Sequence, residues 1–218
     1  LSGLTGCIFS VHGPNAQIHD YLTQSQGSFD QAMQGIKNLK KLGLLDIETN
    51  STILKQNYRH LPEMEKLFLS LNIHNSGFIF PDPDPSGLAY TNFDLVVPRL
   101  KEVAPFVRKA ICIGIEGGAT HVVTQYIPVC FMQGLENHIG EFVSEPETEH
   151  HAIDFVDLDV ISNRQKIGKS KGKQCIICRY YKVCEGLWKQ YAKRVGFEEL
   201  VPVEGEQIAD KKMLRTLL

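Results

Sequence analysis

Hydrophobic and polar positions along this 218-residue chain fall into two kinds of pattern, one typical of buried strands and one typical of amphipathic helices. Apolar residues fill most of 4–12, which predicts a buried strand of a parallel sheet. Further strands are predicted over 44–54, 77–80, 122–129 and 152–156. Because strands that alternate with helices form βαβ units, we expect a parallel sheet with right-handed crossovers.

Helices are predicted where apolar residues recur three or four positions apart. The first spans 28–42, with Ser28 and Gln31 as a capping box and Gly43 as its C-terminal stop. Further helices are predicted over 62–71, 94–115 and 187–195. The fold class is therefore α/β. About three such βα units are too few to close a (β/α) barrel of about eight strands, so we expect an incomplete one.

Composition agrees with a globular protein, because 43% of the residues are hydrophobic and 22% are charged. No apolar run is long enough to span a membrane, and no secretory signal opens the chain, so a cytoplasmic location is expected. The formal net charge of -2 argues against nucleic acid or a membrane surface as a partner.

Three of the six cysteines form the strongest chemical signal, Cys175-x2-Cys178-x5-Cys184. This spacing lets thiolates converge on one metal ion or cluster, which we favour over disulfides. A closed site needs a fourth ligand. Cys130 is the best candidate, and Cys112, His150 and His151 are weaker ones. The spacing alone fits an iron–sulfur cluster and zinc equally well.

Several short motifs carry a family resemblance through their order and spacing. The first part of the chain contains Phe9-Ser-Val-His-Gly13, His19-Asp20, Gly27-Ser-Phe-Asp30 and Gly35-Ile-Lys-Asn-Leu39. The later part contains Tyr126-Ile-Pro-Val-Cys130 and the cysteine triplet followed by Glu185-Gly186. Together they resemble the C-terminal part of a radical S-adenosylmethionine (radical SAM) enzyme, with an auxiliary-cluster extension of the SPASM or twitch kind.

The resemblance implies a division into two parts. Residues 1–120 would be a partial TIM-type barrel with barrel strands four to six, and 121–218 would be the extension. It implies an auxiliary [4Fe–4S] cluster on Cys175, Cys178, Cys184 and Cys130. It also implies that Ser10, Asn50, Thr52 and Phe80, at strand ends, line the pocket for S-adenosylmethionine.

The complete enzyme implied by the resemblance would cleave S-adenosylmethionine to a 5′-deoxyadenosyl radical that takes a hydrogen atom from a substrate. The sequence names no substrate; peptide modification and cofactor biosynthesis are the classes that the family suggests. The Cys-x3-Cys-x2-Cys loop of the family is missing here. We therefore expect this chain alone to be inactive.

Two other interpretations remain open. One is a non-catalytic α/β binding module with a structural zinc ion in the cysteine knuckle, working through a partner. The other is a degenerate, non-catalytic member of the radical SAM family.

Overall fold

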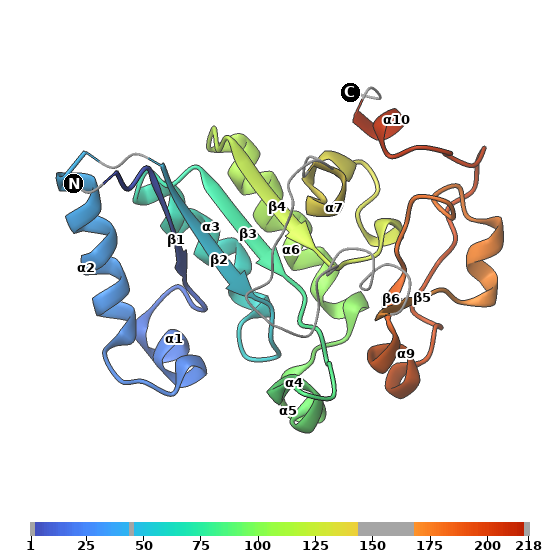
Figure 1. Cartoon of the computed structure of the whole chain (residues 1–218), viewed down its shortest axis with the longest axis horizontal. Coiled ribbons are helices and arrows are strands. Elements are labelled where there is room, and N and C mark those ends of the chain that lie inside the picture. Colours follow the sequence, from blue (N-terminus) through green and yellow to red (C-terminus); the bar gives the residue numbers. More distant parts are fainter. Residues whose placement is uncertain (1–2, 44–45, 144–167, 216–218) are drawn as a thin grey trace. The chain divides into compact units, whose positions relative to one another are not determined.

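The computed structural model describes residues 3–43, 46–143 and 168–215 (Figure 1). The chain divides into two compact units. Unit 1 comprises Leu1–Pro81 and Asp94–Gln125, and unit 2 comprises Asp82–Phe93 and Tyr126–Leu218. The boundary expected from the sequence, between residues 120 and 121, falls a few residues before the end of unit 1.

Unit 1 is built on a parallel sheet, which confirms the α/β class. Its strands follow one another in chain order: β1 (Gly6–Ser10), β2 (Asp46–Thr52), β3 (Asn75–Ile79) and β4 (His121–Gln125). The strand predicted over 122–129 joins this sheet as β4, beside β3, so the sheet has one strand more than the three expected for the barrel part. That strand also ends earlier than predicted, since Tyr126 has a left-handed φ of 67°.

Helices connect these strands as the hydrophobic pattern predicted, with two differences. Unit 1 contains α1 (Ala16–Thr23), α2 (Ser28–Lys41), the 3-10 helix η1 (Tyr58–His60), α3 (Leu61–Ser70) and α6 (Leu100–Glu116). The short α1 was not predicted, although Asn15 caps it by accepting a hydrogen bond from the Ile18 N–H. The helix expected over 94–115 is broken at Val97–Arg99, because Pro98 disfavours helical geometry in the residue before it. A short α5 (Phe93–Val96) precedes the break.

Asp20, at the end of α1, caps the N-terminus of α2. Its carboxylate accepts hydrogen bonds from the Gly27 N–H at 2.6 Å, the Phe29 N–H at 2.8 Å and the Ser28 hydroxyl at 3.0 Å. The predicted capping box of Ser28 and Gln31 is wrong, because Gly27 holds the N-cap position and Ser28 already lies inside the helix. The C-terminal stop at Gly43 is confirmed by its φ of 83°.

The Asp20 cap predicts a stability loss that depends on pH. Hydrogen bonds from the Phe29 and Gly27 N–H groups lower the pKa of the Asp20 carboxyl in the folded protein. Its stabilisation is therefore complete above the unfolded-state pKa and is lost as the pH falls through the lowered folded-state pKa. We expect Asp20→Ala to lower the thermal midpoint at neutral pH, and the difference to shrink in acid, as measured by circular dichroism. The control is Asp30→Ala, on the exposed side of the first turn of α2. Equal losses in both variants would contradict the assignment.

The two faces of the sheet differ in character. Side chains of residues paired across parallel strands lie on the same face, and alternate residues lie on opposite faces. One face carries the buried core: Phe78 stacks on Phe68 of α3, and Ser76 hydrogen-bonds Glu65 of the same helix. Helices α3 and α6 lie behind the sheet in Figure 1. The opposite face carries partly exposed polar residues of β2, namely Glu48, Asn50 and Thr52.

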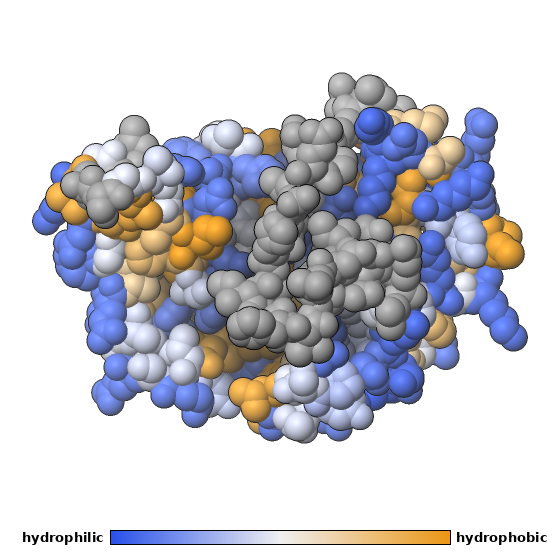
Figure 2. Space-filling view, viewed as in Figure 1, coloured by the Kyte–Doolittle hydropathy of each residue, from blue (hydrophilic) through white to orange (hydrophobic). Residues whose placement is uncertain are grey.

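Strand β1 is an edge of this sheet, paired on one side with β2. Apolar surface is visible over the β1 side of the molecule in Figure 2, where Leu4 and Ile8 are among the exposed large side chains. In the described part of the chain, no helix is both long and apolar enough to cross a bilayer.

Unit 2 is built from short elements joined by turns. They are α4 (Leu88–Thr91), η2 (Val129–Phe131), η3 (Glu136–His138), α7 (Gly140–Val143), β5 (Lys169–Ser170), η5 (Lys173–Ile177), β6 (Leu187–Trp188), α9 (Lys189–Val195) and α10 (Lys212–Arg215). Strands β5 and β6 pair in antiparallel fashion. The helix predicted over 187–195 begins two residues late, and the strand predicted over 152–156 lies outside the described residues.

Candidate metal centre

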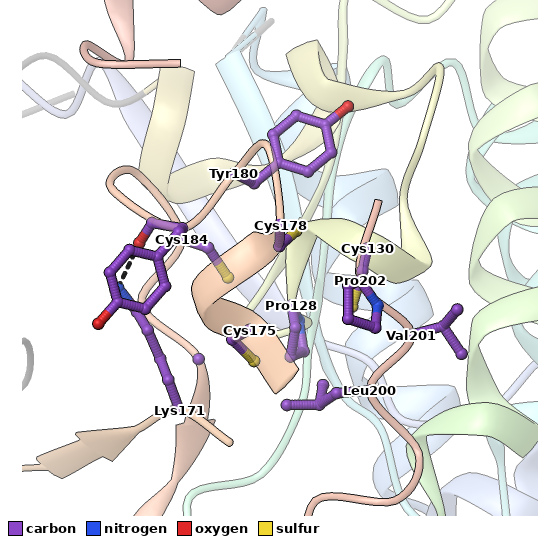
Figure 3. Close-up of a pocket in the computed structure, with 12 residues that line it drawn as sticks. Pro128, Cys130, Lys171, Cys175, Cys178, Tyr180, Cys184, Leu200, Val201 and Pro202 are labelled. Carbon is purple, nitrogen blue, oxygen red and sulfur yellow. Dashed lines mark hydrogen bonds between the residues drawn. The ribbon is translucent and has the colours of Figure 1, made fainter. Parts of the chain in front are cut away.

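Four cysteines from different parts of unit 2 line one cavity. Cys130 lies in η2, Cys175 in η5, Cys178 directly after η5, and Cys184 in the turn that leads to β6. Figure 3 shows them grouped around a single space. That space, counted out to its opening to solvent, is about 360 Å³. The structure thus brings together the cysteine triplet and the fourth cysteine that sequence analysis favoured.

Tight local turns present these thiols. The Cys178 N–H donates to the Cys175 carbonyl at 2.9 Å, so a single turn joins these two cysteines. Gly186 follows Cys184 with a φ of 87°, and a Cβ there would collide with the Ser170 carbonyl. Only glycine combines this conformation with so close an approach of two backbone segments.

The rest of the cavity wall is largely apolar. Pro128, Tyr180, Leu200 and Pro202 line it, and among the described residues Lys171 is the one cation in the lining. The Lys171 ammonium donates to the Tyr181 carbonyl at 2.6 Å, the bond drawn as a dashed line in Figure 3.

Two lysines in the glycine- and lysine-rich residues 168–173 are held by contacts within unit 2, although this composition is typical of a solvated loop. Lys169 is only 5% exposed. Its ammonium lies 3.6 Å from the centroid of the Trp188 ring and 4.7 Å from that of Tyr126, the geometry of a cation–π contact.

Burial disfavours ionisation of these thiols. It raises the pKa of Cys130 to about 12, with further contributions from the neighbouring Cys184 and Cys178. Burial likewise raises the pKa values of Cys175 and Cys184. Buried thiolates that repel one another need a nearby positive charge, which a metal ion or cluster supplies on binding.

Backbone N–H groups close to the sulfurs offset part of the unfavourable effect of burial on thiolate formation. The Val203 N–H donates to the Cys178 sulfur at 3.4 Å. The N–H groups of Val129 and Gly186 interact with Cys184 and act to lower its pKa. Such donors stabilise sulfur in its anionic, metal-binding form. The cavity therefore has the donor set and the surrounding dipoles of a thiolate-ligated centre.

The four cysteine sulfurs are not arranged as the ligands of a single metal ion. A tetrahedral zinc ion with Zn–S bonds of about 2.3 Å holds its sulfurs about 3.8 Å apart. Among the described residues, no group of three or more His, Cys, Asp or Glu side chains is arranged to hold one metal ion. Of the weaker fourth-ligand candidates, Cys112 is exposed on α6 in unit 1, and His150 and His151 lie outside the described residues.

The predicted S-adenosylmethionine residues lie at the carboxyl end of the sheet in unit 1. Ser10 pairs with Asn50 across β1 and β2, and Thr52 ends β2, so all three lie on the open face. Phe80 follows β3 on the opposite face and is 1% exposed, within the core. The structure groups the three polar residues and does not place Phe80 with them.

His12 and His19 form a hydrogen-bonded pair beside these residues. The His12 ring nitrogen Nδ1 accepts from the Thr52 N–H at 3.3 Å, and the His19 Nδ1 accepts from the His12 N–H at 3.0 Å. Burial lowers the pKa of both rings. Since each Nδ1 accepts a hydrogen bond, the neutral form of each ring carries its proton on Nε2. In the sequence, His12 and His19 gave no signal beyond their places in the Phe9–Gly13 and His-Asp motifs.

Fold and site together define an α/β protein with a four-cysteine cavity in a separate compact unit. Over 66 residues, the chain is 33% identical to the AdoMet-dependent heme synthases of Oleidesulfovibrio alaskensis and Nitratidesulfovibrio vulgaris. Those residues are 30% of this chain but only 17% and 18% of the two relatives. No protein-family model and no solved structure matches the chain. The partial similarity supports the resemblance to radical SAM enzymes seen in the motifs.

Proposed function

We propose that this chain is the C-terminal part of a radical SAM enzyme whose unit 2 carries an auxiliary [4Fe–4S] cluster. The observation that carries the proposal is the single cavity lined by Cys130, Cys175, Cys178 and Cys184. Partial similarity to two AdoMet-dependent enzymes favours this reading of the cysteines over a structural zinc knuckle.

The number of cysteines bears on what the cluster does. When bound, a [4Fe–4S] cluster supplies one-electron transfer, and four protein thiolates occupy the outer position on all four of its irons. No iron is then left for a substrate ligand. We therefore assign this centre to electron transfer or to the stability of unit 2, and not to direct substrate binding.

Unit 1 supports the other half of the proposal. Its four parallel strands in sequential order are the arrangement found in part of a (β/α) barrel, where ligands bind at the carboxyl ends of the strands. We place the contact with S-adenosylmethionine at Ser10, Asn50 and Thr52, with Phe80 supporting that end of the sheet from the core. The substrate of the complete enzyme remains unassigned, and a peptide is one class that the family offers.

The chain by itself is proposed to be inactive toward S-adenosylmethionine. Its sequence contains no Cys-x3-Cys-x2-Cys spacing. With all four cysteines of unit 2 committed to one cluster, no iron is open to the amino and carboxylate groups of the cofactor. Incubation of the reduced protein with S-adenosylmethionine should yield no 5′-deoxyadenosine.

Anaerobic purification followed by metal analysis tests the cluster. We expect about four irons and about four sulfides per chain, and a brown protein. One zinc ion with no iron would contradict the proposal and favour the non-catalytic module with a structural zinc. The same sample, reduced and given S-adenosylmethionine, tests inactivity, since any 5′-deoxyadenosine formed would contradict that part.

A further inference from the structure

A four-residue segment far from the cysteine triplet in sequence lies against the cavity. We call Leu200–Val203 the cavity strap, because Leu200, Val201 and Pro202 all line the cavity. Leu200 is buried, whereas Val201 is 69% exposed. The exposed side chain of Val201 indicates that the strap lines the cavity partly with its backbone.

One backbone N–H group of the strap donates a hydrogen bond to sulfur. The Val203 N–H reaches Cys178 Sγ at 3.4 Å. Two residues earlier, the backbone of Val201 acts to lower the pKa of Cys130, the ligand that lies outside the triplet.

The strap is fixed in place by pairing with the residue next to Cys178. The Arg179 N–H donates to the Val203 carbonyl at 2.8 Å, and the Ile208 N–H donates to the Arg179 carbonyl at the same distance. The Gln207 side-chain amide also donates to the Ile176 carbonyl at 2.8 Å. These bonds of the surrounding backbone hold the Val203 N–H in position.

We propose that the cavity strap sets the reduction potential of the group held by the four cysteines, through the hydrogen bond from the Val203 N–H to Cys178. This inference rests on the proposed function. Hydrogen bonds to cluster sulfurs withdraw negative charge, and the reduced state carries more of that charge than the oxidised state. The donor to Cys178 therefore favours reduction and raises the potential.

Proline at position 203 removes the N–H while leaving the residue's carbonyl in place. We expect Val203→Pro to shift the midpoint potential to lower values in a redox titration followed by electron paramagnetic resonance (EPR). Val203→Ala is the matched control, since it shortens the side chain and keeps the N–H. Glu204→Pro, at an exposed position just after the strap, controls for the effect of proline on the chain. A Val203→Pro variant that keeps its iron and matches Val203→Ala in potential would overturn the proposal.

A measurement on the unaltered protein covers the case in which the proline variants lose their iron. The chain is labelled with ¹⁵N-valine, its cluster is reduced, and pulsed EPR detects nitrogen nuclei coupled to the electron spin. We expect a ¹⁵N coupling, because the Val203 amide lies one hydrogen bond from the Cys178 sulfur. The backbone of Val129, which acts on the Cys184 thiol, can add a second coupling, so the signal should persist in Val129→Leu protein with unlabelled leucine even if it weakens. Its disappearance there, or its absence from the start, would overturn the role of the strap.

The experiments distinguish failure of the proposed function from failure of the strap inference. If the unaltered chain binds no iron, the proposed function fails and the strap has no cluster to tune. If it binds about four irons but shows no valine coupling and no proline effect, the cluster assignment stands and the strap inference alone is wrong.

Discussion

Cys130→Ser is expected to reduce the iron content of the anaerobically prepared protein from about four to about three or fewer per chain. Cys130 lines the same cavity as the cysteine triplet, and its hydroxyl replacement is a far poorer ligand for iron. Because ligand binding energy contributes to folding, the Cys130→Ser variant should also melt at a lower temperature than the parent. Iron and sulfide analysis, with thermal melts under nitrogen, measures both effects.

Two further variants calibrate the Cys130 result. Cys112→Ser changes an exposed cysteine on α6 in unit 1 and should leave iron content and melting temperature unchanged. Cys178→Ser removes a member of the triplet and should lose iron as Cys130→Ser does. If Cys130→Ser keeps the full iron content while Cys178→Ser loses it, the fourth ligand lies elsewhere.

Glu65→Gln is expected to stabilise the protein at alkaline pH by up to about 3 kcal/mol. Glu65 is 0% exposed on α3 and lies between Ser76 of β3 and Gly114 of α6. Its Oε2 accepts from the Ser76 hydroxyl at 2.7 Å, while its Oε1 is buried without a hydrogen-bond partner. Burial raises the pKa of this carboxyl to about 7, against the lowering effect of the Ser76 hydrogen bond.

The sign of the pH dependence follows from that raised pKa. Between the usual carboxyl value of 4.5 and about 7, the folded protein holds a proton that the unfolded chain has released. Stability therefore falls as the pH rises through this window, and the cost of ionising Glu65 is fully present above it. Glutamine has the shape of the protonated acid and cannot ionise, so its advantage should be small at about pH 5 and largest above about pH 8.

Urea unfolding at both pH values measures the effect of Glu65→Gln as a change in the free energy of unfolding. Glu116→Gln is the control, because it changes the same group at the exposed last position of α6. A gain from Glu65→Gln that is the same at both pH values would contradict ionisation of a buried acid. A gain of equal size in the control would point to overall charge instead.

Local patterns in the sequence were enough to predict much of unit 1. The helix ending before Gly43 and the helix beginning near Pro62 were found because their hydrophobic periods and end residues are local signals. The cap on α2 was missed for the opposite reason. Asp20 reaches the helix from α1, whereas Ser28 and Gln31 matched a local motif that the chain does not use.

The candidate metal centre shows the same division. The triplet of Cys175, Cys178 and Cys184 was visible from spacing alone, since residues so close in sequence are held near one another by the chain. Cys130 was a choice among several candidates, and only the folded chain placed it in the same cavity. The cavity strap gave no sequence signal, because backbone N–H groups are present at almost every residue and only their direction matters.

The sequence by itself determined the α/β class, the order of most strands and helices, and three of the four cysteines of the cavity. All of these depend on interactions between residues within a turn or two of one another. The tertiary structure decided that β4 joins the same sheet as the first three strands, and it decided the burial of Lys169, the place of Cys130 and the hydrogen bond from Val203 to Cys178. Each of these requires segments distant in sequence to meet, and the free energy of such contacts depends on the packing of the whole unit.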